Sequence, residues 1–323
     1  MRQLLLDPSV FDPQNIPSDT AKLNRELVEA AKAAPDMWNF EPEVVRQARR
    51  DGKSAFPLEA EDPNAKTFEI PGPAGPIALR VISPDQEKAK GVFLHIHGGG
   101  WVLGAADLQD QRLKQLANET GLDCISVEYR LAPEHPYPAG PDDCECAALW
   151  LAQQSQPRFN TQFMAIGGES AGAHLAVNAL LRLRDKHGLT PFNGAVLVAG
   201  AYDMSQTPSG RNFHNPLVLT TRDMNKFNQA FLQNGEDFGD PDISPLYADL
   251  TGMPPAHFTV GTLDALLDDS VFMANCWIKS QEDTELEVFA GGCHVFQYFD
   301  HLEQSQKSRK QMSAFLNRLM EKA

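Results

Sequence analysis

Short apolar segments alternate along this chain with longer segments in which apolar residues recur at helical spacing. The apolar segments are residues 91–97, 124–130, 163–168, 194–202, 257–261 and 285–292, and the helical ones are residues 108–121, 142–154, 171–188 and 308–323. Strands that alternate with helices form a mainly parallel sheet with helices on both faces. The pattern therefore predicts an α/β fold around a mostly parallel central sheet.

The first 55 residues have a different pattern from the rest of the chain. They predict two helices, the first capped by Ser18 or Asp19 and ending before Pro35. This polar segment precedes the first strand signal, a hairpin whose two strands are joined by "PGPAGP". We therefore expect residues 1–55 to form an accessory helical layer and residues 56–323 to form the main domain. An excursion at about 204–232 interrupts that domain, and insertions of this length usually have a functional role.

Composition narrows the class of protein. The chain has 323 residues, of which 42% are hydrophobic and 22% charged, as is ordinary for a globular protein. Its net charge of −15 argues against nucleic acid and anionic membrane partners. No apolar run suits a signal peptide or a membrane span, and five scattered cysteines do not suggest a disulfide framework. We therefore expect a cytoplasmic enzyme or binding protein.

Candidate chemistry begins in the stretch "GGESAGAHLA", where Ser170 lies between Gly168 and Gly172. The stretch follows a predicted strand and opens a predicted helix. In that setting, G-x-S-x-G is typical of a nucleophilic serine on a sharp strand-to-helix turn. A serine hydroxyl is a poor nucleophile unless a base removes its proton, so the sequence should also supply a histidine oriented by a carboxylate.

The order serine, carboxylate, histidine is expected for this architecture and selects the partners. His294 directly follows the last apolar segment, within "AGGCHVFQYF". Asp264 lies just beyond the end of the strand predicted at 257–261. Asp268 and Asp269 lie farther along, where we expect roles on a helix surface. These positions indicate His294 as the base and Asp264 as its carboxylate partner.

Acyl transfer through a serine also needs backbone N–H donors for the oxyanion. Ala171, directly after the serine, can supply one. The glycines of "HIHGGGWVLG", Gly98, Gly99 and Gly100, can supply others because no side chain blocks their amides. A phosphate cradle is the competing interpretation, and it is disfavoured because no lysine and Ser/Thr follow at P-loop spacing.

Six stretches together resemble one known family. They are "HGGGW" at 97–101, "YRLAPEHPYPA" at 129–139, "GESAG" at 168–172, "SPLYADLTGMPPA" at 244–256, "DALLDD" at 264–269 and "HVF" at 294–296. The chain is similar to bacterial hormone-sensitive-lipase-like carboxylesterases of the α/β-hydrolase family. The resemblance implies an α/β-hydrolase fold with a catalytic triad and an oxyanion hole. It also implies that residues 1–55 and 204–232 form a helical cap over the active site.

The resemblance implies a role for each of six residues. Ser170 is the nucleophile, His294 the general base and acid, and Asp264 the orienting carboxylate. The amides of Gly99, Gly100 and Ala171 form the oxyanion hole. The chain departs from the family pattern at Glu169, Ala173, His174, Ala265 and Val295. A β-branched valine disfavours positive φ. We therefore expect the loop that contains Val295, where the family commonly has glycine, to be stiffer or differently turned.

Several residues allow a structural and a functional interpretation. His95 and His97 share one face of a strand, but zinc usually needs three or four ligands and no third is evident, so no metal or other cofactor is expected. Cys144 and Cys146 are best explained by helix packing. Cys293 is best explained as a small buried residue, and a reactive thiol beside the histidine is the alternative.

The residues of the substrate pocket are less clear from the sequence. Trp101 follows the glycine run and could either pack in the core or line the pocket. Met37, Trp38 and Phe40 could form the inward face of the cap or its packing seam. Both interpretations stay open for these four residues, which are the candidate pocket residues.

The sequence therefore predicts a serine carboxylesterase that forms an acyl-enzyme on Ser170. The charged cap offers no broad apolar face for a lipid surface, so we expect soluble esters with short to medium acyl chains of about two to eight carbons. An amidase or acyltransferase with the same triad, and a non-catalytic binding protein on this fold, are the alternatives. The expected partner is a small ester, and homodimerisation is left open.

Overall fold

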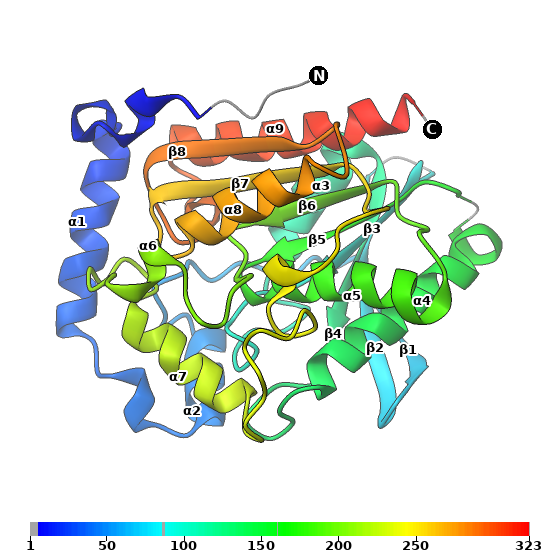
Figure 1. The fold of residues 1–323 in the computed structure, drawn as a ribbon, viewed down its shortest axis with the longest axis horizontal. Helices are drawn as coiled ribbons and strands as arrows, with labels where there is room; N and C mark the ends of the chain where they lie inside the picture. Colours follow the sequence, from blue (N-terminus) through cyan, green and yellow to red (C-terminus); the bar gives the residue numbers. More distant parts are fainter. Residues whose placement is uncertain (1–5, 86–87, 160, 323) are drawn as a thin grey trace.

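The structure is a computed structural model that describes residues 6–85, 88–159 and 161–322 (Figure 1). These residues form one eight-stranded sheet with the order β1-β2-β4-β3-β5-β6-β7-β8, in which β2 alone runs antiparallel to its neighbours. The strands are β1 (Lys66–Gly72), β2 (Gly75–Ile82), β3 (Gly91–Ile96), β4 (Leu122–Glu128), β5 (Met164–Glu169), β6 (Gly194–Val198), β7 (Ala256–Leu263) and β8 (Glu285–Cys293). The predicted mostly parallel sheet and its hairpin are confirmed.

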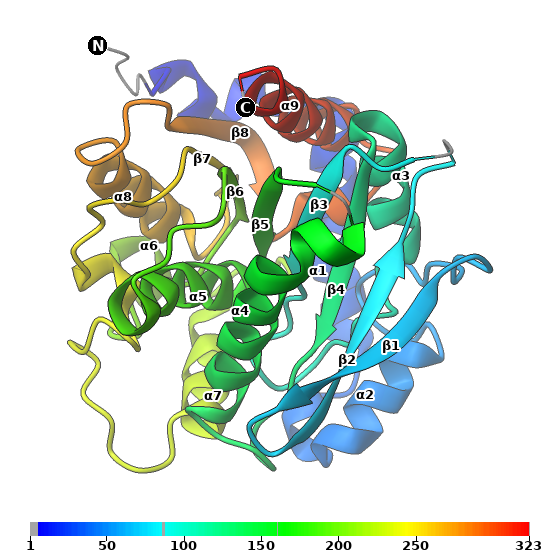
Figure 2. The ribbon, with the colours of Figure 1, turned by 90° about the vertical axis from the view of Figure 1, so that its right-hand side faces the viewer.

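Helices cover both faces of the sheet (Figures 1 and 2). One face carries α4 (Ala139–Phe159), α5 (Ala171–His187) and α8 (Leu267–Trp277), and the other carries α3 (Asp110–Thr120) and α9 (Glu303–Met320). Successive side chains of a strand point to opposite faces. In β3, accordingly, Leu94 packs in the cluster beneath α4 and α5, whereas Phe93 packs in the cluster beneath α3 and α9.

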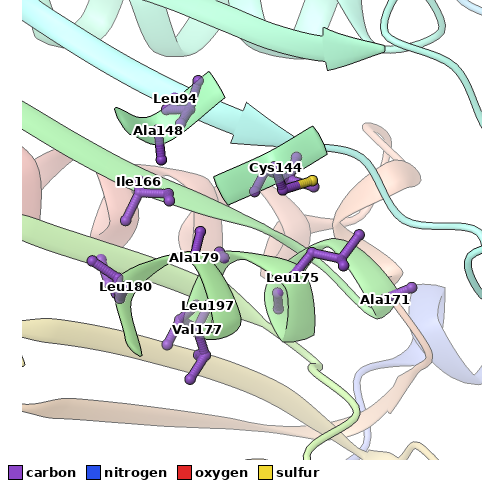
Figure 3. Close-up of a cluster of buried hydrophobic side chains, with 14 of the residues drawn as sticks. Leu94, Cys144, Ala148, Ile166, Ala171, Leu175, Val177, Ala179, Leu180 and Leu197 are labelled. Carbon is purple, nitrogen blue, oxygen red and sulfur yellow. The ribbon is translucent and has the colours of Figure 1, made fainter. Parts of the chain in front are cut away.

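The layer between the sheet and α4 and α5 is tightly packed (Figure 3). Leu94, Ile166 and Leu197 of three neighbouring strands contribute to the same buried cluster as Ala148 of α4 and Ala179 of α5. All five side chains are fully buried, and alanines on both helices let the helix backbones approach the sheet closely. This packing holds α5, and with it the turn from β5 into α5, in a fixed position on the sheet.

Two segments far apart in the sequence meet on one side of the molecule (Figure 1). We call them the roof segments. Residues 6–55 contain α1 (Ser18–Ala33) and α2 (Pro42–Arg50), and residues 204–232 contain α6 (Pro208–Arg211) and α7 (Thr221–Phe231). Trp38 joins them, because its ring packs edge-on against Phe227 at 4.8 Å and its Nε1 donates to Asp223 at 2.8 Å. The guanidinium of Arg222 also pairs with Asp36 at 2.6 Å.

Single-turn helices complete the described elements, at Pro8–Phe11 (η1), Pro13–Asn15 (η2), Met37–Asn39 (η3), Pro245–Tyr247 (η4) and Phe296–Tyr298 (η5). One predicted helix start is wrong. Ser18 is already helical, Pro17 occupies the capping position, and no side chain caps the helix. In α7, by contrast, Thr220 and Asp223 bond each other's backbone amides and form a capping box.

Candidate active site

Ser170 occupies the turn between β5 and α5 in a backbone conformation that non-glycine residues rarely adopt. Its φ is 56° and its ψ is −121°, and its amide donates to the carbonyl of Val198 at 2.9 Å. The flanking glycines are required by the close approach of β3. A Cβ on either Gly168 or Gly172 would collide with the carbonyl oxygen of Ile96. The turn therefore needs both glycines, and it presents the serine side chain to the cavity that lies above it.

Three side chains from three different strand ends form one hydrogen-bonded series. His294 Nε2 lies 2.9 Å from Ser170 Oγ, and His294 Nδ1 lies 3.0 Å from each carboxylate oxygen of Asp264. Asp264 also accepts the amide of Leu266 at 2.8 Å, which fixes the carboxylate in place. Asp264 is only 1% exposed, and His294 is only 5% exposed. A buried carboxylate in this position holds the ring so that Nε2 can accept the serine proton.

The loop after His294 places its valine in a conformation that valine disfavours. Val295 adopts the left-handed conformation, with φ 47° and ψ 43°, although valine disfavours positive φ. Its side chain is buried in the same cluster as Tyr298, and the Tyr298 amide donates to the Val295 carbonyl at 3.0 Å. Packing and this hydrogen bond hold the valine in a turn that its intrinsic preference opposes.

Three backbone amides near the serine are not used in the hydrogen bonding of the described residues. The N–H groups of Gly99, Gly100 and Ala171 donate no hydrogen bond to any residue that the structure describes. A Cβ on Gly100 would run into the ring of Phe227, which descends from α7. The glycine therefore brings the loop under the roof and leaves its amide free to bind a substrate oxygen.

Trp101 has both of the roles that the sequence left open. It lines the cavity, and its ring stacks on Phe231 with centroids 4.6 Å apart. Its Nε1 donates to His174 Nδ1 at 3.1 Å, and His174 Nε2 donates to the carbonyl of Ile243 at 3.0 Å. Burial lowers the pKa of His174 to about 4, so the ring stays neutral and can accept from Trp101. The sequence marked His174 only as a departure from the family pattern.

The carboxylate of Glu169, directly before the serine, forms hydrogen bonds behind the active site. Its carboxylate lies 3.2 Å from His95 Nε2, and Gln109 donates to it at 3.5 Å. His95 Nδ1 lies 3.0 Å from the hydroxyl of Ser126. Burial opposes ionisation, but the charge and hydrogen bond of His95, followed by the charge of Arg112, lower the pKa of Glu169 overall. Glu169, one of the departures from the family pattern, thus places a charged carboxylate beneath the site.

His97, which the sequence placed on the same strand face as His95, has different partners from His95. His97 Nδ1 donates to the carbonyl of Gly98 at 2.9 Å, and its ring stacks on Tyr129 at 4.2 Å. Burial lowers the pKa of His97 to about 3. Over the described ranges of the chain, no three His, Cys, Asp or Glu side chains are grouped so that they could hold a metal ion.

A cavity of about 1000 Å³ opens above Ser170 and His294. Of the four candidate pocket residues, Met37, Phe40 and Trp101 line it. Trp38 does not line it, and instead joins the two roof segments. Further apolar side chains that line the cavity include Val44, Val45, Phe56, Leu103, Met204, Val218, Leu219, Met224, Phe227, Leu266 and Val295.

The cysteines near and below the site are packing residues. Burial raises the pKa of the Cys293 thiol to about 12, and its side chain packs with Phe289 and Phe296. Cys144 is fully buried beneath the sheet, and the thiol of Cys146 donates to the carbonyl of Pro71 at 3.2 Å. The buried environment of Cys293 supports the packing interpretation over the reactive thiol.

We expected Asp268 and Asp269 to have roles on a helix surface, and for Asp269 that expectation is wrong. Asp269 is 1% exposed. It accepts the amides of Tyr202 and Asp203 at 2.7 and 3.0 Å and the hydroxyl of Thr207 at 2.6 Å. Asp268 accepts the amide of a serine at the start of α6. The expectation was wrong for Asp269 because its carboxylate binds free backbone amides of the segment that leads into the roof.

Comparisons with known proteins agree with this geometry. A family model described as the alpha/beta hydrolase fold matches residues 93–298. The chain is 36% identical to the carboxylic ester hydrolase LipN of Mycobacterium tuberculosis over 71% of its length, and this match covers 63% of LipN, a little under two thirds of that relative. It is 29% identical to an acetyl esterase of Salmonella paratyphi A, over 76% of each chain.

Solved structures extend the likeness to nearly the whole chain. A hyperthermophilic esterase from Pyrobaculum calidifontis superposes with a TM-score of 0.84 at 27% identity, covering 94% of this chain and 98% of that one. An α/β hydrolase from the metagenome of Lake Arreo superposes with a TM-score of 0.85 at 28% identity and the same coverage. The chain therefore belongs to the α/β-hydrolase fold family, among its carboxylesterases. None of the helices in the described ranges combines the length and apolar character that crossing a membrane requires.

Proposed function

We propose that Ser170, His294 and Asp264 are the catalytic triad of this carboxylesterase. His294 Nε2 takes the proton of Ser170 Oγ while that oxygen attacks the ester carbonyl carbon, and it then gives the proton to the leaving alcohol. Water, activated by the same ring, hydrolyses the acyl-enzyme. Asp264 orients the ring and stabilises its charged form. The supporting observation is the unbroken series of hydrogen bonds from Ser170 through His294 to Asp264.

The amides of Gly99, Gly100 and Ala171 are the proposed oxyanion hole. As the tetrahedral intermediate forms, its oxygen becomes negative, and preorganised N–H donors stabilise that charge without reorganisation. The lack of any other acceptor for these three amides among the described residues supports the assignment. The roof segments are the proposed cap, which closes the cavity over the reacting ester.

Short- to medium-chain esters are the proposed substrates. Apolar walls, including Met37, Phe40 and Trp101, suit a hydrocarbon chain, and the cavity volume of about 1000 Å³ limits the size of the substrate. Several relatives are named acetyl esterases, which supports activity on small acyl groups.

Covalent labelling tests the assignment of the nucleophile. A fluorophosphonate probe should label the native protein, and it should label neither the heat-denatured protein nor the Ser170→Ala variant. Equal labelling of the variant would overturn the role of Ser170. Hydrolysis of p-nitrophenyl butyrate, compared with the matching p-nitroanilide, separates an esterase from an amidase. Adding EDTA to the same assay should leave the rate unchanged, since the mechanism uses no metal.

A cytoplasmic location and a homodimer are further proposals. The five cysteines are all free in the structure, and free thiols suit a reducing compartment. Fractionation of the native host tests the location. Light scattering coupled to size-exclusion chromatography tests the dimer, for which a mass near twice 35.6 kDa is expected.

A further inference from the structure

Three arginines lie on α2, and they have very different surroundings. Arg46 donates to the carbonyls of Val102 and Ala132, at 2.9 Å each, and pairs with Glu134 at 2.8 Å. Arg50 pairs with Asp107 at 2.8 Å. The third, Arg49, has no hydrogen bond and no ion pair with any residue that the structure describes.

The unpaired arginine lines the active-site cavity. Arg49 shares that lining with Ser170 and His294, and its guanidinium carbon lies 5.2 Å from the centre of the Phe56 ring. The ring offers a favourable surface for a cation, but it provides no hydrogen-bond acceptor for the guanidinium N–H groups. An arginine stays protonated in proteins, so the cavity lining carries a positive charge that has no hydrogen-bonded partner among the described residues.

The other Lys and Arg side chains that line the cavity are already paired. The two further Lys and Arg side chains lining the cavity within the described residues are Lys53, which pairs with Asp51 at 3.1 Å, and Arg222, which pairs with Asp36. Glu169 acts on Arg49 only at a distance, since its carboxylate is bonded to His95 and Gln109. Burial is the main influence on Arg49 and lowers its pKa.

A charged group in a partly buried site is costly unless it is paired. A neutral ester would leave the Arg49 guanidinium unpaired when it displaces water from the cavity. A substrate carboxylate would meet two parallel N–H donors in the geometry that a guanidinium prefers. The protein as a whole carries a net charge of −15 and does not attract anions in general. An anion is therefore favoured only close to the Arg49 guanidinium.

We propose that Arg49 is an anion-binding subsite of the substrate cavity, and that the preferred substrates are small esters that carry a free carboxylate. This inference rests on the proposed esterase mechanism at Ser170. Two kinds of ester share the required chemistry. In one, the carboxylate is on the acid side, as in half-esters of dicarboxylic acids, and in the other it is on the alcohol side, as in acylated hydroxy acids.

The test compares charged and neutral esters of similar size in a pH-stat, which measures the acid released. Monomethyl glutarate against methyl hexanoate probes the acid side, and 3-acetoxypropionate against butyl acetate probes the alcohol side. For one of these pairs, the wild-type kcat/KM should favour the charged ester. In Arg49→Met, that charged-to-neutral ratio should fall about ten- to a hundredfold, the range for a hydrogen bond to a charged group, mainly through KM. In Arg49→Lys, the charged-to-neutral ratio should fall less than in Arg49→Met.

Arg50→Met is the matched control, because it removes the same charge from the same helix but at a side chain outside the cavity lining. Its charged-to-neutral ratio should equal that of the wild type. A purely structural role of Arg49 would slow both esters of a pair alike and leave the ratio unchanged, which would overturn the proposal. A wild type that hydrolyses neutral esters but neither charged one would also overturn it, while the esterase mechanism would stand. No hydrolysis of any ester would contradict the mechanism itself.

Discussion

The floor and the roof of the cavity are held in place by different kinds of interaction. The floor consists of Ser170, Asp264 and His294 with the free amides beside them, and each of its side chains follows directly from the end of a strand. The roof segments are joined to one another by side chains, chiefly through Trp38 with Asp223 and Phe227.

This difference separates the reaction from the choice of substrate. The sheet and its packed helices determine where the floor atoms lie, so the same proton transfers can operate on many esters. The roof segments contribute side chains rather than strand ends to the site, so their inward residues can vary while the strand ends keep their positions. Arg49 belongs to the roof, and its proposed role is accordingly one of specificity.

Breaking the floor should produce the largest effect. Members of a triad act as a unit, so Ser170→Ala and His294→Ala should each lower kcat on p-nitrophenyl butyrate by about a millionfold. Asp264→Asn should cost about ten-thousandfold, since the ring loses its orientation. Circular dichroism should show that the variants stay folded. A Ser170→Ala protein with a tenth of the wild-type kcat, free of contaminating enzyme, would refute the assignment.

Disturbing the contact between floor and roof should produce the second-largest effect. In Gly100→Ala, the new methyl group meets the Phe227 ring, at a backbone φ of 62° that alanine disfavours. The loop must shift, and losing one oxyanion donor costs about a hundred- to a thousandfold in kcat. Adding Phe227→Ala should restore part of the activity by making room. A single Gly100→Ala variant within threefold of the wild type would show that its amide does not bind the oxyanion.

Acid should lower the stability of the fold through two buried histidines near the floor, His97 and His174. The unfolded chain protonates histidines near pH 6.5, whereas folded His97 and His174 have pKa values of about 3 and about 4. Between these limits the unfolded chain binds more protons, so stability falls as the pH is lowered. Each histidine contributes at most about 1.4 kcal/mol per pH unit.

Urea unfolding at pH 7, 6 and 5 measures this dependence. His174→Gln should be less stable than the wild type at pH 7, but its free energy of unfolding should fall less steeply between pH 6 and 5. The slope is the relevant quantity, because the loss of the Trp101 hydrogen bond shifts all three values together. An unchanged slope would mean that His174 is protonated in the folded protein.

Changes in acyl-chain length, which probe the roof, should produce the smallest effects. Across p-nitrophenyl esters from acetate to palmitate, kcat/KM should rise by about fourfold for each added methylene that the apolar wall buries. It should then decline once the chain outgrows the cavity, beyond about eight carbons. A maximum at twelve carbons or more, with activation at an oil–water interface, would show that the roof serves a lipase.

The strands and the residues of the floor were predictable from the sequence because their signals are local. An apolar run of strand length followed by a glycine turn places Ser170 and His294 at strand ends, whatever the rest of the chain does. The family model and the structural comparisons confirm the predicted fold. The catalytic roles stay predictions, and so does the division into cap and catalytic domain.

The roof was harder to predict because its contacts are between distant residues. Trp38 and Asp223 are 185 positions apart, and no periodicity links them, so the pattern left open whether Trp38 lines the pocket or packs between the roof segments. Arg49 has the same surroundings in the sequence as its neighbour Arg50. Only the fold shows which of the two faces the cavity. Asp269 was misjudged for a related reason, since the amides that it accepts belong to a segment 66 and 67 positions away.

The attachment of α1 has a consequence for how this protein is made. Asn24 donates to the carbonyl of Gly291 at 2.8 Å, across 267 positions of sequence, and Leu23 and Leu27 pack in one cluster with Leu217 and Phe289. Chains are synthesised from the N-terminus. Residues 23–27 must therefore wait for these partners until residue 291 has been synthesised. On the proposed mechanism, the base at His294 follows three residues later, so a nascent chain acquires its triad only after the partners of α1 are also present.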